Sequence, residues 1–76
     1  MIKVLFFAHL RDAVGEESVL ADLTGKTVLE AKTVLSKTYG VNLDTVMAAV
    51  NEEFATDDDV LSDGDVVAFI PPVSGG

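Results

Sequence analysis

A single long helical pattern at residues 27–40 constrains the fold of this chain more than any other feature. Thr27 and Glu30 have the spacing of a capping box, in which each side chain can bond to the backbone N–H of the other residue. Apolar residues then recur at helical spacing along one stripe: Val28, Ala31, Leu35 and Tyr39. Gly40 follows, where glycine typically ends a helix. One helix can cover one face of a small sheet, so we expect the fold to be built around that contact.

The segments before this helix have the composition of two strands. Residues 1–7 are rich in β-forming residues and are partly apolar on both faces, which predicts a first strand. Residues 8–14 contain good helix formers and precede Gly15, so we expect a short helix or turn there. Residues 17–23 suggest a second strand.

Three further strands are predicted after the helix. Residues 46–50 and 53–55 suit a hairpin with a turn at residues 51–52. Residues 62–65 have turn chemistry. Residues 66–70 are a nearly continuous apolar run, which is typical of a central strand shielded on both faces.

The expected element order is ββαβββ, which indicates an α+β fold with a mixed sheet of about five strands on one main helix. We expect residues 1–76 to form a single domain, because a chain of 76 residues lies near the lower size limit for independent folding. With one helix covering one face, apolar residues would remain on the other face. Such patches usually contact another protein.

Composition excludes several classes of function. The absence of cysteine rules out a disulfide framework, a thiolate metal site and a cysteine nucleophile within this chain. The net charge of −8 disfavours nucleic acid and anionic membranes as partners and favours a protein with a basic docking surface. A secretion signal and an apolar stretch long enough to span a bilayer are both lacking, so we expect a cytoplasmic protein.

Several patterns resemble catalytic or ligand-binding motifs but lack a required part. Residues 25–27 mimic the end of a phosphate-binding loop, yet Leu20 stands where its leading glycine belongs. The acidic residues 57–59 do not fit the calcium-loop spacing and are interpreted as a solvated loop. His9 is the only histidine, so we expect a surface or partner contact and no metal site. Ser74 has no elbow motif or triad.

The C-terminal end is the predicted working part of the chain. Pro71 and Pro72 favour an extended, semi-rigid exit from the fold, and we expect residues 71–76 to form a flexible tail with a reach of roughly 20 Å. Gly75 and Gly76 lack a Cβ, so they can thread into a narrow active site. The alternative is an ordinary frayed terminus.

Three stretches resemble the molybdopterin synthase small subunit family. They are residues 1–8 (MIKVLFFA), residues 49–52 (AVNE) and residues 63–76 (DGDVVAFIPPVSGG). The resemblance covers the whole chain, and the Pro-Pro-Val-Ser-Gly-Gly ending is its most specific part. It implies a ubiquitin-like β-grasp fold, which agrees with the element order above, although periodicity alone leaves other small α+β folds open.

The resemblance also implies a sulfur carrier that is not an enzyme on its own. A ubiquitin-activating-like adenylyltransferase would use ATP and magnesium to adenylate the Gly76 carboxylate. A sulfur donor, such as a cysteine desulfurase or rhodanese-like protein, would then convert it to a thiocarboxylate. The large subunit of the synthase would use this sulfur to build molybdopterin from cyclic pyranopterin monophosphate. By the same resemblance, the chain itself binds no cofactor and no metal.

Partner contacts carry over from the family to Phe7, Phe54 and Ile70. These residues would form an apolar patch that docks on the activating enzyme and on the large subunit, in an assembly of two small and two large chains. The predicted partner-binding tail comprises Pro71, Pro72, Val73 and Ser74. The alternative is that Phe7, Phe54 and Ile70 belong to the core.

Two other functions stay open. A related carrier would share the fold and the Gly-Gly chemistry but deliver sulfur to thiamine or tRNA, although the Pro-Pro-Val-Ser spacer favours molybdopterin. A noncatalytic β-grasp interaction module would need the apolar patch and not the terminal glycines.

Overall fold

The computed structural model describes residues 1–72 and contains every predicted strand and helix. The elements in chain order are β1 (Ile2–Phe6), α1 (His9–Val14), β2 (Ser18–Ala21), α2 (Val28–Tyr39), β3 (Met47–Val50), β4 (Glu53–Ala55) and β5 (Val66–Ile70). The predicted bounds of β5 are confirmed. The strand predicted at residues 17–23 is shorter, because only residues 18–21 pair with β1.

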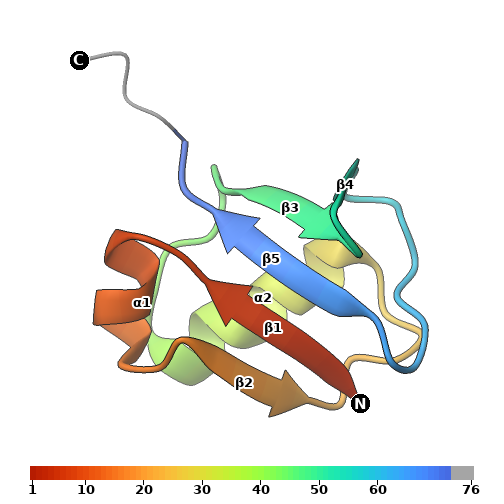
Figure 1. Cartoon of the computed structure of the whole chain (residues 1–76), viewed down its shortest axis with the longest axis horizontal. Coiled ribbons are helices and arrows are strands. Elements are labelled where there is room, and N and C mark those ends of the chain that lie inside the picture. Colours follow the sequence, from red (N-terminus) through yellow and green to blue (C-terminus); the bar gives the residue numbers. More distant parts are fainter. Residues whose placement is uncertain (73–76) are drawn as a thin grey trace.

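The strands form one mixed sheet in the order β2-β1-β5-β3-β4. β5 lies in the centre, parallel to β1 and antiparallel to β3, while β2 and β4 form the two edges. Figure 1 shows α2 crossing behind the sheet and α1 beside the end of β1. The parallel pair joins the two ends of the sequence, since Lys3 to Phe6 pair with Val66 to Phe69.

Helix α2 begins and ends at the predicted residues. The Thr27 N–H donates to Glu30 Oε1 at 2.9 Å, and the Glu30 N–H donates to Thr27 Oγ1 at 3.2 Å, which completes the capping box. Gly40 ends the helix with a left-handed φ of 66°. These local contacts explain why the helix could be located from the sequence.

The core lies between α2 and the sheet. Ile2, Val4 and Phe6 of β1 alternate with solvent-side residues and are buried, as are Val67 and Phe69 of β5. The predicted helical stripe faces them: Val28, Ala31 and Leu35 are buried, and Tyr39 packs against the core. Each fully buried large aliphatic or aromatic side chain contributes about 1.5 to 3 kcal/mol through the hydrophobic effect, so this layer is the main source of stability.

Strand β5 is central, but it is not shielded equally on both faces. Val67 and Phe69 are buried under α2, whereas Val66, Ala68 and Ile70 on the opposite face are only partly buried. The prediction of double shielding was wrong in this respect, because α2 covers one face of the sheet and the other face carries no helix (Figure 1). The mixed sheet on one main helix is the β-grasp fold implied by the family resemblance.

Candidate functional site

The face of the sheet opposite α2 is mostly apolar, and we call it the open face. The strand registers place on it Lys3, Leu5, Ser18, Leu20, Met47, Ala49, Phe54, Val66, Ala68 and Ile70. Leu20 and Phe54 are 69% and 73% exposed, which is unusual for large apolar side chains. The open face therefore has the character of a protein contact surface.

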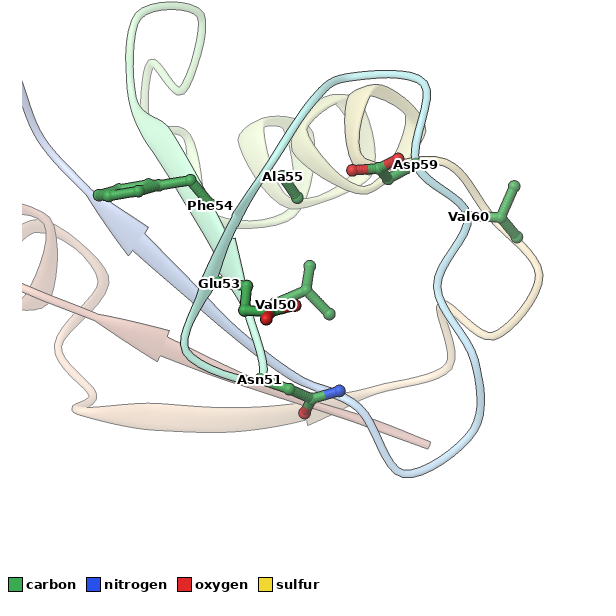
Figure 2. Close-up of a pocket in the computed structure, with 7 residues that line it drawn as sticks. All are labelled: Val50, Asn51, Glu53, Phe54, Ala55, Asp59 and Val60. Carbon is green, nitrogen blue, oxygen red and sulfur yellow. The ribbon is translucent and has the colours of Figure 1, made fainter.

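The three predicted contact residues lie on this face. Phe7 directly follows β1 and is 46% exposed. Phe54 extends from β4 in the direction opposite to Val50 and Val60 (Figure 2). Ile70 pairs with Met47 on the same face and is partly buried. The alternative that these residues belong to the core is wrong, because their side chains lie on the side of the sheet that α2 does not cover.

A shallow hollow of about 500 Å³ lies in the middle of the open face. Ala49 of β3 and Ala68 of β5 are direct cross-strand partners there. Leu5, Phe7 and Val66 also line it, and two residues of the β3–β4 turn complete its lining. This hollow was not predicted from the sequence.

The β3–β4 turn is confirmed at residues 51–52, with left-handed φ values of 51° at Asn51 and 72° at Glu52. Asn51 also ties this turn to the start of β5. Its N–H donates to Val66 O at 2.8 Å, and its Oδ1 accepts the Val66 N–H at 3.0 Å. Its Nδ2 donates to Asp65 Oδ1 at 2.9 Å. The sequence had indicated a turn at Asn51 but not this link to β5.

Asp65 receives two hydrogen bonds at the edge of the site. The Ser62 N–H donates to its Oδ2 at 2.8 Å, and the Asn51 amide donates to its Oδ1. These bonds, the one from Ser62 first, hold the pKa of Asp65 below its usual range. The carboxylate therefore stabilises the turn before β5 in its charged form.

Lys32 makes contacts that were not predicted from the sequence. Its side chain is only 10% exposed, and Nζ donates to Val46 O and to Asp57 Oδ1, both at 3.1 Å. It lies four residues after Val28, so the helical stripe itself could have placed it at the border of the buried face. The acidic loop at residues 57–59 is thus exposed as predicted, but one of its carboxylates pairs with a buried cation.

A second hollow, of about 290 Å³, lies between β4 and the loop that carries Asp59 and Val60 (Figure 2). Within residues 1–72 the structure has no cluster of His, Cys, Asp or Glu able to hold a metal ion. His9 is exposed at the first turn of α1, as predicted for a surface residue. Neither helix of the described part combines the length and apolar character required to cross a membrane.

The predicted tail begins where β5 ends. Pro71 is partly buried, and Pro72 is exposed immediately after it. The remaining residues of the predicted tail and terminal site lie outside the described residues: Val73, Ser74, Gly75 and Gly76. Their roles, like the contact roles of Phe7, Phe54 and Ile70, stay predictions.

Comparison with known proteins gives a consistent relationship. The model of the ThiS family matches residues 4–76. The molybdopterin synthase sulfur carrier subunit of Escherichia coli (strain K12) is 42% identical over 81 aligned positions, covering 100% of both chains.

Solved structures agree with this relationship. Small archaeal modifier protein 1 from Haloferax volcanii superposes with a TM-score of 0.81 at 28% identity, covering 99% of this chain and 98% of the other. A chain from the complex of subunits 1 and 2 of the molybdopterin-converting factor of Helicobacter pylori gives a TM-score of 0.66 at 26% identity, with coverages of 99% and 97%. The protein therefore belongs to the ThiS family, and it matches the Escherichia coli molybdopterin synthase sulfur carrier subunit along the whole length of both chains.

Proposed function

We propose that this protein is the sulfur carrier subunit of a molybdopterin synthase. The observation that carries this proposal is the Gly75–Gly76 pair, which follows β5 by a few residues in the sequence of a chain that matches the Escherichia coli carrier over its full length. The apolar open face supports the proposal, because a carrier must dock on other proteins to present its tail.

The chemistry begins at the Gly76 carboxylate, which is a poor electrophile by itself. In the proposed first step, a carboxylate oxygen attacks the α-phosphorus of ATP on an activating enzyme, and pyrophosphate leaves. Sulfide then attacks the acyl carbon and displaces AMP, which gives the thiocarboxylate directly. Alternatively, a donor persulfide attacks the same carbon, and a thiol then reduces the resulting acyl disulfide to the thiocarboxylate. ATP and magnesium belong to the activating enzyme, and this chain needs no cofactor of its own.

Transfer follows in the active site of the large subunit. The thiocarboxylate sulfur is a nucleophile held on a tether, so the large subunit supplies orientation and charge stabilisation while this chain supplies the atom. Two such transfers would convert cyclic pyranopterin monophosphate into molybdopterin, in an assembly of two small and two large chains. Phe7, Phe54 and Ile70 would dock the carrier, and residues 71–74 would span the distance to the active site.

Fragment mass spectrometry after incubation with the activating enzyme, ATP and a sulfur source tests the proposal. We expect oxygen-to-sulfur exchange confined to a fragment spanning residues 66–76. Methionine oxidation adds nearly the same mass, but Met1 and Met47 lie outside this fragment. Deletion of Gly76 should leave the fold intact and abolish sulfur transfer in a reconstituted synthase.

The outcomes separate the alternatives. Absence of exchange with a demonstrably active enzyme would favour an interaction module. Exchange without formation of molybdopterin would favour a carrier for another thiolation pathway. Transfer by the Gly76 deletion variant would contradict the carrier mechanism itself.

A further inference from the structure

The hollow on the open face owes its depth to two small side chains. Ala49 and Ala68 lie opposite each other on β3 and β5. Larger residues form the next pair on the same face, since Met47 pairs with Ile70 two residues along the strands. Leu5 and Phe7 border the alanines on the β1 side. An apolar depression of about 500 Å³ results, in a region of the sheet that α2 does not cover.

The rim of this hollow carries one ionisable group among its lining residues, the carboxylate of Glu52. Glu52 is exposed and occupies the second position of the β3–β4 turn. The neighbouring amide of Asn51 is already engaged with Asp65 and Val66. The hollow therefore offers an apolar floor with a single negative charge at its edge.

We propose that this hollow is the anchor site for one large apolar side chain of the synthase large subunit, and that Glu52 selects a basic residue next to that side chain. The proposal rests on the proposed function and identifies which part of the open face carries the binding energy. At protein interfaces a few large side chains in desolvated pockets contribute most of the affinity. A charged rim adds specificity and accelerates association.

Charge and geometry argue against other occupants. A small-molecule site usually has several convergent polar groups, and here the turn provides one free carboxylate. A second copy of this chain would bring two molecules of net charge −8 together. A basic partner meets neither difficulty.

Filling the hollow tests the anchor. Ala68→Leu adds bulk at its floor, and Ala13→Leu makes the same change at an exposed position of α1, outside the open face. By calorimetry with the purified large subunit, we expect Ala68→Leu to weaken the Kd at least tenfold and Ala13→Leu to leave it within about twofold. Thermal unfolding verifies that both variants are folded.

The role of the Glu52 charge is tested without the Ala68→Leu substitution. Glu52→Gln should weaken the Kd severalfold at low salt and reduce its salt dependence, whereas Glu53→Gln, on the helix side of the neighbouring strand, should do neither. Unchanged affinity in Ala68→Leu would overturn the anchor, and unchanged affinity and salt dependence in Glu52→Gln would overturn the role of Glu52.

Failure of the anchor and failure of the carrier function are distinguishable. In one outcome, the wild type acquires the thiocarboxylate while wild type and Ala68→Leu bind the large subunit with equal affinity. That result would refute the anchor site and leave the carrier function intact. If the wild type self-associates and Ala68→Leu abolishes this self-association, the hollow binds a second copy of this chain. That result would likewise overturn the proposal.

Discussion

Ala8 has an unfavourable backbone conformation next to the open face. Its φ of 53° with ψ of −132° lies outside the regions that residues with a Cβ readily adopt. The turn is held by hydrogen bonds from Leu10 N–H to Phe7 O and from Arg11 N–H to Ala8 O, each 3.1 Å. This turn directs the chain from β1 into α1 directly after Phe7 and so determines where that side chain lies. Strain of this kind is usual where surrounding contacts impose a conformation.

Replacement of Ala8 by glycine should therefore stabilise the protein. We expect Ala8→Gly to increase the free energy of unfolding by about 1 kcal/mol, because the relief of strain exceeds the entropic cost of glycine. In a domain of this size that corresponds to a rise in Tm of roughly 4 to 8 °C, measurable by calorimetry. The matched control is Ala13→Gly in α1, where the exposed helical position should make glycine destabilising. A loss of stability in both variants would show that Ala8 is not strained.

At the scale of elements, Lys32 connects three parts of the chain. From α2, its ammonium group reaches the carbonyl that precedes β3 and the carboxylate of Asp57 in the loop after β4. The amides of Val28 and Leu29 donate to the carbonyls of Asp59 and Asp57 in the same loop. The long connection between β4 and β5 is thereby attached to the N-terminal half of α2.

Substitution of Lys32 by methionine should weaken this attachment. Lys32→Met keeps the apolar stem but leaves the buried Val46 carbonyl without its donor, at a cost of about 1 to 3 kcal/mol. Urea unfolding measures this loss. Asp57→Asn should cost less, because the side chain of Asp57 is 54% exposed and retains an acceptor. Lys37→Met, at an exposed position of the same helix, should change stability by less than about 0.5 kcal/mol, and an equal effect in both helix variants would contradict the role of Lys32.

The whole molecule is strongly acidic, yet several of its carboxylates stabilise the fold. Hydrogen bonds from the backbone and side chain of Thr27 lower the pKa of Glu30, and the Met1 ammonium group lowers the pKa of Asp63. The Ser62 amide and then Asn51 lower the pKa of Asp65. A carboxyl group whose pKa is lower in the folded state stabilises that state above its unfolded pKa. The contribution is lost as the pH falls through the folded pKa.

The difference in stability between wild type and Asp65→Asn should accordingly depend on pH. We expect the wild type to be more stable at pH 7, with the difference diminishing below the unfolded pKa of about 3.9. Urea unfolding at a series of pH values measures it. Asp58→Asn is the control, since the exposed Asp58 side chain accepts no hydrogen bond within residues 1–72, and at pH 7 it should change stability by less than about 0.5 kcal/mol. A difference for Asp65→Asn that stays constant down to pH 2 would contradict the assigned hydrogen bonds.

Local features were predictable to within a few residues. The capping box of Thr27 and Glu30, the glycine after α2 and the apolar run of β5 each depend on neighbours in the sequence. Features that depend on distant segments were harder to predict from the sequence. The bounds of β2 depend on pairing with β1, and Lys32 in a helical stripe has no local feature that reveals its distant partners.

The sequence by itself determined the helix, the turns and the strand-forming segments, because short-range hydrogen bonding, periodicity and residue type specify them. Only the tertiary structure decided that β1 lies parallel to β5, that Phe7, Phe54 and Ile70 share one face, and that Ala49 meets Ala68 to form a hollow. Strand order and register result from packing between segments far apart in the chain, since α2 can bury one face of the sheet and leaves the other open.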